Sequence, residues 1–492
     1  MKTSIAAVLA ATLAVTSIIP AFAQELRDEF YFLDRLNRAS LIMMSEQDIL
    51  DSGQVDNIKS ALDQLLVKAE EDGFPRSGYY GGIEPYLIEF GGPDVSRLHT
   101  GRSTWDTGAT NVRMQQREDI LAAYEALIDA RQALLNFAAN NPDALIPAYT
   151  GGVQAQPVSL GHFLTAYAEA YGRHADALES AFATINLSAM GAAALGGSSY
   201  PLDRERLSEL LGFDRPIHNT YDAVLLASVE SQMRLAGAAA GIAITTGMLA
   251  EDLGNQYYLA RPWLTFPVGA AGSTIMPQKQ NPNGVNNTRE AATSALGDVA
   301  QYMFDIHKTE TGHFAYGTST IATLMDNTTA SLDGVTGMFD TLIFHEDRAL
   351  DQVLDDYATA TELANTLQRV GNIPFRDAHH IVTGVVNFGR ANGLRASAIT
   401  FEQFEEVFAE VAAEFDLPQE SAGITAEDLA RALSPQNMVA ASQGLGGPQP
   451  ASVQAMMEEN AASIEQDRAW LVETRARLDA ASAALDEAFT EL

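Results

Sequence analysis

Three long stretches of the chain contain no proline, and this absence restricts the fold more than any other feature of the sequence. They cover residues 158–200, 217–261 and 283–373, and all three are rich in Ala, Leu, Met and Glu. Proline inside a helix removes a hydrogen bond and clashes with the preceding turn, whereas these four residue types favour helix. The sequence therefore predicts long helices.

One of these helices, expected over residues 222–253, has apolar side chains on nearly every face. Such a helix is typically buried on all sides in a bundle, and at about 1.5 Å per residue it would be about 45 Å long. Small residues at positions 237–241 would let neighbouring helices approach closely, from the same subunit or from others. No alternating pattern is strong enough to predict a central sheet. The predicted fold class is all-α.

Breaks in the helical pattern divide the chain that follows residue 23 into three parts. They occur near residues 105–112 and 360–372. We expect an N-terminal helical domain over 24–108, a central bundle of long helices over 109–361, and a C-terminal helical domain over 362–492.

The first 23 residues have the layout of a secretory signal peptide. Lys2 precedes an apolar run over residues 5–19, and Ala21-Phe22-Ala23 then forms an A-x-A cleavage site. The run is short for a membrane span, and an uncleaved anchor is the alternative. We expect cleavage after Ala23 and a secreted or periplasmic protein. No later run is expected to cross a bilayer, so the mature form is expected to have no membrane contact.

The charge and the cysteine count exclude several classes of protein. The formal net charge is −34 and there is no cysteine. So acidic a surface repels nucleic acid and anionic membranes, and without cysteine there is neither a disulfide framework nor thiol catalysis. His307, His379 and His380 lack further ligands at metal-site spacing, so no metal site is predicted. No cofactor is expected, because no glycine-rich phosphate loop follows a strand.

A polar segment, AGSTIMPQKQNPNG at residues 271–284, lies between two of the helical stretches. It has little to bury and would weaken any helix that it interrupted, so its backbone shape and polar groups are the reason to keep it. We expect a catalytic loop over 269–284. Its residues fit G-S-x-x-M-x-x-K-x-N, which has five fixed positions at fixed spacing.

That pattern is the signature of the fumarase/aspartase superfamily, and further segments resemble argininosuccinate lyases. LHTGRSTWDTGAT at 98–110 is similar to their H-T-G-R-S-R-N-D segment, and AYTGGVQAQPVSLGH at 148–162 to their Y-T-H-L-Q-x-A-Q-P segment. Other similar segments lie at 194–214, 360–380 and near the C-terminus. The resemblance implies a homotetramer whose long helices form one shared bundle, with each active site assembled from three subunits.

The resemblance also assigns roles for a β-elimination. The reaction removes a weakly acidic proton beside a carboxylate and then holds the doubly charged intermediate, which requires a base and fixed positive or donor groups. The family pattern places the base at Ser273, with Lys279 and Asn281 stabilising the carboxylate that gains charge. The residues expected to bind the succinyl carboxylates are Thr100, Ser103 and Thr150.

A serine hydroxyl is a poor base at neutral pH. It needs a lowered pKa and a loop that closes to exclude water. We expect Gly269, Gly272 and Gly284 to give the loop its hinge freedom.

Two departures from the family lie at the expected site. Gly151 follows Thr150 where the family has the His taken as proton donor or relay, and Asn286 stands where the family has the Glu paired with that His. Either the leaving group needs no such acid or another residue protonates it. The candidate acids are His99, Tyr149 and Tyr316.

The end of the site that holds the rest of the substrate differs as well. Thr104-Trp105 replaces the Arg-Asn of argininosuccinate lyases. Argininosuccinate is therefore an unexpected substrate, and the leading hypothesis is an exported carbon–nitrogen lyase that releases fumarate and an amine from an N-substituted aspartate or related succinyl compound. The alternatives are a catalytically silent dicarboxylate-binding or structural protein, and a C–O or C–S lyase acting on a succinyl-type substrate.

Overall fold

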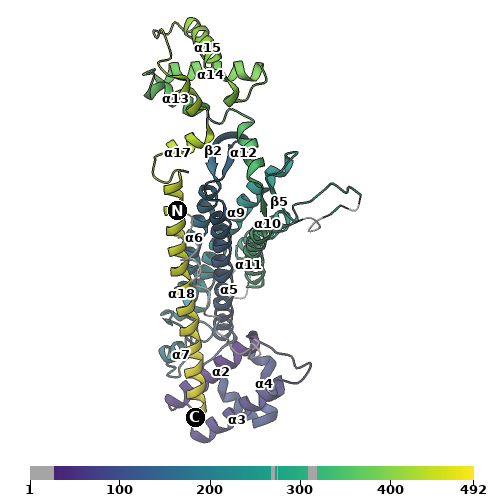
Figure 1. Cartoon of the computed structure of the whole chain (residues 1–492). Helices are drawn as coiled ribbons and strands as arrows, with labels where there is room; N and C mark the ends of the chain where they lie inside the picture. Colours follow the sequence, from purple (N-terminus) through teal and green to yellow (C-terminus); the bar gives the residue numbers. More distant parts are fainter. Residues whose placement is uncertain (1–26, 268–271, 274, 308–317) are drawn as a thin grey trace, which may run out of the picture.

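The computed structural model describes residues 27–267, 272–273, 275–307 and 318–492. Its N-terminal part consists of four helices (Figure 1). They are α2 (Glu29–Glu46), α3 (Ser52–Ala69), α4 (Tyr80–Gly91) and the 3-10 helix η1 (Pro93–His99). Asp28 caps α2, and a capping box of Asp51 and Gln54 begins α3. The expected signal peptide lies outside the described residues.

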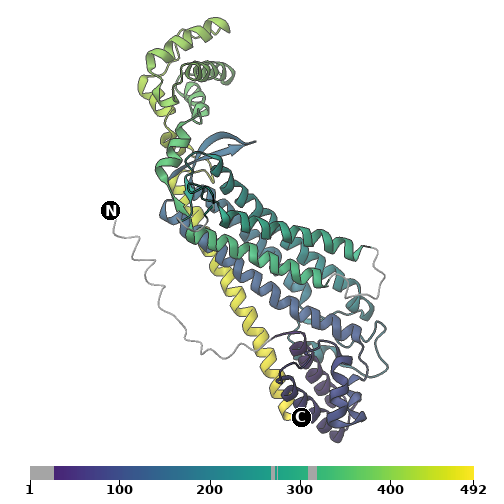
Figure 2. The ribbon, with the colours of Figure 1, turned by 90° about the vertical axis from the view of Figure 1, so that its right-hand side faces the viewer.

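Five long helices form the centre of the molecule and run side by side in Figure 2. They are α5 (Thr104–Asn140), α6 (Leu160–Ile185), α9 (Leu226–Asn255), α10 (Asn283–Ile306) and α11 (Thr318–Thr341). Their buried Ala and Leu side chains form the largest core of the chain. This arrangement confirms the predicted all-α class and the long central bundle.

The apolar helix expected over 222–253 differs in two ways from its prediction. A short helix, α8 (Thr220–Val224), ends at a break at Leu225, whose φ and ψ are −122° and −75°, and α9 begins only at Leu226. Nor is α9 buried on all sides by its own subunit, because Ile244 and Met248 are 51% and 59% exposed. The subunit alone therefore leaves part of this apolar surface in contact with water.

One expectation about membranes needs correction. By length and composition, the segment Leu226–Tyr258 is apolar enough to cross a bilayer. Half of its most apolar window is buried, however, and it packs against α6, α10 and α11. In this fold the segment is a bundle helix.

The described strands form three two-stranded pairs. An antiparallel hairpin joins β1 (Leu145–Thr150) to β2 (Val153–Ser159), and its two-residue turn places Gly151 and Gly152 at φ 58° and 78°. Positive φ at both positions is typical of a type I′ turn, which glycine adopts without strain. The other pairs are β3 (Leu187–Ser188) with β4 (Arg215–Pro216) and β5 (Leu264–Thr265) with β6 (Ile343–Phe344).

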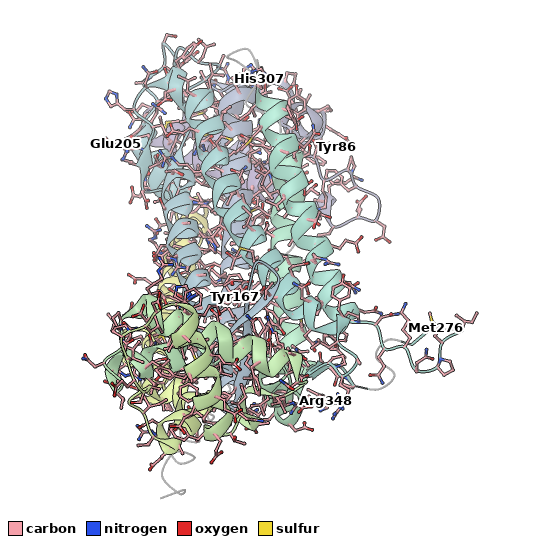
Figure 3. All side chains as sticks on the ribbon, turned by 90° about the horizontal axis from the view of Figure 1, so that it is seen from above. Tyr86, Tyr167, Glu205, Met276, His307 and Arg348 are labelled. Atoms are coloured by element: carbon pink, nitrogen blue, oxygen red, sulfur yellow. The ribbon has the colours of Figure 1, made fainter. Side chains whose placement is uncertain are left out.

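The expected catalytic loop connects β5 to α10. Figure 3 shows the segment around Met276 extending away from the bundle, and Ile275 beside it is 82% exposed. The 3-10 helix η2 (Gln256–Tyr258) lies between α9 and β5.

Residues 357–433 form a lobe beyond one end of the bundle (Figure 1). A separate core, which includes Leu363, Ile381 and Phe404, packs inside it. Its helices are α13 (Ala360–Arg369), α14 (Phe375–Ala391), η3 (Ala396–Ala398), α15 (Phe401–Glu414) and α16 (Ala426–Ala432). Two helices join the lobe to the hairpin: α12 (Glu346–Leu354) packs on β1, and α17 (Pro435–Ala441) packs on α16 and β2. His380 stacks on Phe415 there, with ring centroids 4.1 Å apart.

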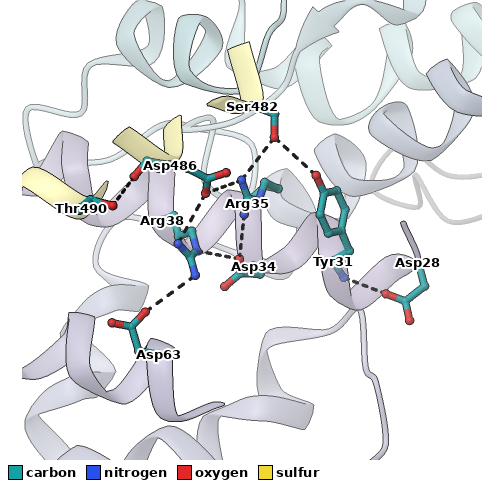
Figure 4. Close-up of polar contacts among 9 residues, drawn as sticks. All are labelled: Asp28, Tyr31, Asp34, Arg35, Arg38, Asp63, Ser482, Asp486 and Thr490. Atoms are coloured by element: carbon teal, nitrogen blue, oxygen red, sulfur yellow. Dashed lines mark hydrogen bonds and ion pairs between the residues drawn. The ribbon is translucent and has the colours of Figure 1, made fainter. Parts of the chain in front are cut away.

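The last helix, α18 (Pro450–Glu491), leaves this lobe and returns along the bundle to the N-terminal helices. Figure 4 shows how it is attached there: Asp486 accepts a hydrogen bond from Arg35 Nη1 at 2.7 Å and lies 3.6 Å from Arg38 Nη1. Arg38 also donates to the buried Asp34. The residues expected as one C-terminal domain, 362–492, are thus divided between the lobe and the bundle. Helix α7 (Arg204–Leu210) also packs on α18.

Candidate active site

The corner where η1 ends and α5 begins contains the first group of expected site residues. Ser103 caps α5, because its Oγ accepts from Trp105 N at 3.3 Å and Asp106 Oδ1 accepts from Ser103 N at 2.8 Å. The cap uses the Ser103 hydroxyl as an acceptor and leaves its proton free to donate. Thr100 lies three residues earlier and is partly exposed. Both hydroxyls therefore lie where α5 starts, at fixed backbone positions.

Asp106 holds this corner together. Its Oδ1 also accepts from Thr107 N at 3.0 Å, and its Oδ2 accepts from Gly191 N and Ala193 N, each at 3.0 Å. Burial raises the pKa of Asp106 to about 6, although these N–H donors and Arg102 favour the ionised carboxylate. Sequence reasoning did not single out Asp106, since two of its four N–H partners, Gly191 and Ala193, lie more than 80 positions away.

A buried guanidinium lies directly behind the corner. Arg102 donates from Nη2 to Asn37 Oδ1 at 2.9 Å and from Nη1 to Leu98 O at 3.3 Å, and burial lowers its pKa. No carboxylate contacts Arg102 in the part of the chain that the structure describes. Its Nε, Asn37 Nδ2 and the Tyr80 hydroxyl are buried without partners among the described residues. Unpaired donors around a buried positive charge favour an anion in their neighbourhood.

His99, a candidate acid, belongs to the same corner. Its ring stacks on Tyr80 with centroids 4.5 Å apart, and burial together with Arg102 lowers its pKa to about 4. His99 is therefore neutral at neutral pH and has no imidazolium proton to give to a leaving amine.

Thr150 and Tyr149 lie at the end of β1. Helix α5, with its 37 residues, separates them from the corner by about 55 Å. Thr150 is exposed, and Tyr149 is 45% exposed with a pKa that partial burial raises. Tyr149 therefore stays protonated at neutral pH and can act only as a neutral donor.

The loop provides a defined environment for Ser273. Its Oγ accepts from the backbone N–H groups of Met276, at 3.0 Å, and Ile275, at 3.4 Å. N–H donors that point at a hydroxyl oxygen favour negative charge on that oxygen. The loop also folds back on itself through a bridge between Gly272 and Gln280.

Lys279 and Asn281 follow on the same loop. Lys279 is exposed, its N donates to Met276 O at 3.0 Å, and its Nζ forms no ion pair with any described residue. Asn281 is half-buried. Both side chains are therefore available to a ligand.

The three glycines expected to act as hinges of the loop lie in different surroundings. Gly284 is inside α10, and a Cβ built there would lie 3.0 Å from the Phe266 ring, so this glycine serves close packing. Gly272 has open space around it. Gly269 and the candidate acid Tyr316 lie outside the described residues.

One subunit thus places the corner and the hairpin at opposite ends of α5, and the loop extends away from the bundle (Figures 1 and 3). The base and the corner hydroxyls do not meet within it.

Comparison with known proteins decides the family. A lyase family model matches residues 94–297, and a model of the argininosuccinate lyase C-terminal region matches residues 357–440. The argininosuccinate lyase of Methanoculleus marisnigri is 32% identical over 473 residues, which cover 91% of this chain and 90% of that protein. The chain belongs to the argininosuccinate lyase family. The argininosuccinate lyase of Natronomonas pharaonis is 31% identical to this chain, and the match covers 87% of each of the two chains.

Solved structures agree with this membership of the argininosuccinate lyase family, and with it of the fumarase/aspartase superfamily. EDDS lyase in complex with formate is 30% identical, with a TM-score of 0.85 over 94% of this chain and 91% of that one. A variant of EDDS lyase with bound fumarate matches equally well. A fumarate lyase from Mesorhizobium sp. BNC1, at 17% identity and a TM-score of 0.68, shares the fold.

The two positions that depart from the family pattern, Gly151 and Asn286, are both exposed to solvent. A Cβ at Gly151 would contact nothing within 4 Å, so space does not exclude a side chain there. The left-handed φ would cost a larger residue roughly 1–2 kcal/mol. Asn286 Oδ1 accepts from Arg289 Nη2 at 3.3 Å, and Arg289 also pairs with Glu251 at 2.9 Å. Asn286 is thus part of a surface polar chain on α10.

Proposed function

We propose that this protein is an exported homotetrameric lyase that cleaves an N-substituted aspartate or related succinyl compound to fumarate and an amine. The observation that carries the proposal is the position of the Ser273 Oγ between two backbone N–H groups, on a loop with the full family signature. Family membership and the fumarate bound to a variant of EDDS lyase support the chemistry.

The proposed reaction begins when Ser273 removes the proton from the carbon beside a carboxylate. The electron pair forms the C=C bond of fumarate as the C–N bond breaks, and the amine departs with a proton. Lys279 and Asn281 stabilise the charge that builds on the carboxylate. No cofactor takes part in these steps.

Thr100, Ser103 and Thr150 are proposed to hold the substrate carboxylates. The buried Arg102, with the unpaired donors of Asn37 and Tyr80 beside it, places positive potential behind Thr100 and Ser103. A hydroxyl that donates in front of a fixed positive charge binds a carboxylate better than a hydroxyl alone.

The separation of these groups supports an assembly of several subunits, and we propose the homotetramer that the family resemblance implies. A corner and a hairpin at opposite ends of a helix about 55 Å long meet only if different subunits contribute them. Leu226, Ile244 and Met248 of α9 and Leu296 and Phe304 of α10 are exposed apolar residues that such an assembly would cover. Light scattering on the mature protein is expected to give four subunits, and an active monomer would exclude the shared site.

The substrate is proposed to differ from argininosuccinate, because Thr104 and Trp105 replace Arg and Asn of the family pattern. Trp105 packs instead beside a small apolar cluster that includes Ala189 and Ile217. The leaving amine either needs no acid or takes its proton from Tyr149 or Tyr316, since His99 is neutral.

The location is proposed from the first 23 residues alone. Mass spectrometry of protein from the medium or the periplasm is expected to find Gln24 as the first residue. A membrane-bound form that keeps Met1 to Ala23 would contradict export.

Gly151 and Asn286 favour a second candidate, a catalytically silent protein that binds a dicarboxylate. A panel of N-substituted aspartates, with C–O and C–S analogues of the same succinyl core, separates the possibilities through the absorbance of fumarate. Fumarate formation from one subset identifies the bond that breaks. Silence across the panel, together with fumarate binding in calorimetry, would identify the binder.

A further inference from the structure

A hollow of about 660 Å³ lies between the β1–β2 hairpin, the first turn of α6 and the end of α9. It is separate from the corner at the start of α5, because all of its walls belong to the opposite end of the bundle. Its lining residues are Ile146, Pro147, Ala148, Tyr149, Gly151, Gly152, Val158, Phe163, Asp252, Asn255, Gln256, Tyr258, Leu259 and Trp263.

The lining combines aromatic rings with a single charge. Tyr149, Phe163, Tyr258 and Trp263 supply the rings, and Asp252 is the one charged residue among the described lining residues. Faces of aromatic rings attract cations, and a carboxylate that forms no ion pair with any described residue does the same. The hollow therefore favours a cation, whereas the corner with Arg102 favours an anion.

Asp252 is held in a fixed position. Its Oδ2 accepts from the Tyr167 hydroxyl at 2.5 Å, and the Tyr167 ring lies edge-on to Phe163 with centroids 5.3 Å apart (Tyr167 is labelled in Figure 3). Its second oxygen accepts no hydrogen bond from any other described residue. This leaves one carboxylate oxygen for a ligand.

Trp263 supplies an independent sign of a ligand. The residue is only 4% exposed, and its Nε1–H is buried without an acceptor among the described residues. A buried N–H without a partner costs free energy, and a ligand in the hollow that brings an acceptor to this N–H would recover it. The next residue, Leu264, is fixed by two hydrogen bonds with Gln256, so the indole cannot easily turn away.

We propose that this hollow binds an organic ammonium ion with an aromatic body and one hydrogen-bond acceptor. The ammonium group lies beside Asp252, the body lies against the rings of Phe163 and Tyr149, and the acceptor takes the Trp263 N–H. Gly151 and Gly152 at the rim carry no side chain that would close the entrance. The hollow shares Tyr149 with the proposed active site, but its proposed ligand has the charge opposite to that of a dicarboxylate.

Calorimetry on the full-length mature protein tests it with three matched probes. Tyramine carries the ammonium group, tyrosol has a neutral hydroxyl in its place, and 4-hydroxyphenylacetate has a carboxylate. Tyramine is expected to bind about 10-fold more tightly than tyrosol, and 4-hydroxyphenylacetate is expected not to bind. Equal affinity for tyramine and tyrosol would overturn the proposal.

Two variants locate the binding. Asp252→Asn keeps an acceptor for Tyr167 and is expected to reduce tyramine affinity to that of tyrosol, whereas Trp263→Phe is expected to weaken both probes about threefold. Glu251→Gln is the matched control: it removes one negative charge from the adjacent position, where the carboxylate pairs with Arg289 outside the hollow. An equal loss in Glu251→Gln, or unchanged binding in Asp252→Asn, would refute the site.

The same titration in Ser273→Ala keeps this proposal apart from the proposed reaction. Tyramine is expected to bind this variant as it binds the unaltered protein. If the substrate panel is silent and tyramine still binds, the hollow stands and the lyase assignment fails. If fumarate is released but tyramine does not bind, the lyase assignment stands and the proposed binding in the hollow fails.

Discussion

The corner at the start of α5 and the loop that carries Ser273 both hold polar groups for a ligand, but they do so in opposite ways. In the corner, Asp106 accepts four backbone N–H groups from two separate segments, and its side chain is fully buried. In the loop, the contacts of Ser273 come from the two residues that follow it closely, and its neighbour Ile275 is 82% exposed.

This difference indicates how each region contributes to a site. The corner is complete within one subunit, because the chain brings its own donors and acceptors together there. The loop fixes only the local geometry of Ser273 and depends on ligand or neighbouring subunits for the rest. Changes in the loop should therefore affect function, whereas changes in the corner should affect folding as well.

The largest expected effect comes from removing the base. Ser273→Ala is expected to reduce turnover by roughly 10²–10⁴-fold while fumarate still binds, because the carboxylate anchors remain. Steady-state kinetics and calorimetry measure the two quantities. Gln278→Ala on the same exposed loop is the control and should retain most of the activity. Turnover in Ser273→Ala within a factor of a few of the original would make the loop a binding element only.

A change in the corner is expected to lower the stability of the folded protein. Asp106→Ala leaves four N–H groups without their acceptor and releases the segment at 191–193, so the free energy of unfolding should fall by about 3 kcal/mol. Urea denaturation followed by circular dichroism gives this value. Asp94→Ala nearby removes only an exposed ion pair with Arg97 and should change little. Similar stabilities for the two variants would mean that Asp106 does not stabilise the packing of the start of α5 against residues 191–193.

A smaller effect is expected for the lysine of the loop. Lys279→Ala should lower kcat/KM by about 10- to 100-fold and also weaken fumarate binding, since a fixed cation contacts the carboxylate in the ground state and in the transition state. The unfolding free energy should stay the same, in contrast to Asp106→Ala. Lys68→Ala, with the same change of charge in α3, is the control. Loss of turnover without loss of binding would assign Lys279 to the transition state alone.

The smallest expected effect is the pH dependence of the corner. The pKa of His99 is lowered to about 4 in the folded protein, whereas an unfolded histidine titrates near pH 6.5. Stability from its neutral form is thus present above pH 6.5 and is lost as the pH falls through 4. Between those values the original protein should lose about 1 kcal/mol more than His99→Gln. Parallel urea denaturation curves across this range would contradict the burial of a neutral imidazole.

Several features could be predicted because their causes are local. Proline-free stretches rich in Ala and Leu predicted α6, α9, α10 and α11, and the fixed spacing from Gly272 to Asn281 located the loop and its serine. Helix α5 lies outside those stretches. The break at Leu225 and the hairpin turn at Gly151 and Gly152 were missed. The break carries no proline or glycine to mark it, and glycine pairs occur in many kinds of loop.

The sequence by itself determined the fold class, the family motif and the residue types that a β-elimination needs, because helix propensity and motif spacing act between near neighbours in the chain. Only the tertiary structure decided that Asp106 is bonded to residues 191 and 193, that Arg102 lies beside Asn37, and that α18 returns to the N-terminal helices. It also decided that Trp263 and Asp252 share one hollow. These contacts join positions that are 11 to more than 400 residues apart in the chain. Packing and burial select such contacts, and no local sequence pattern indicates them.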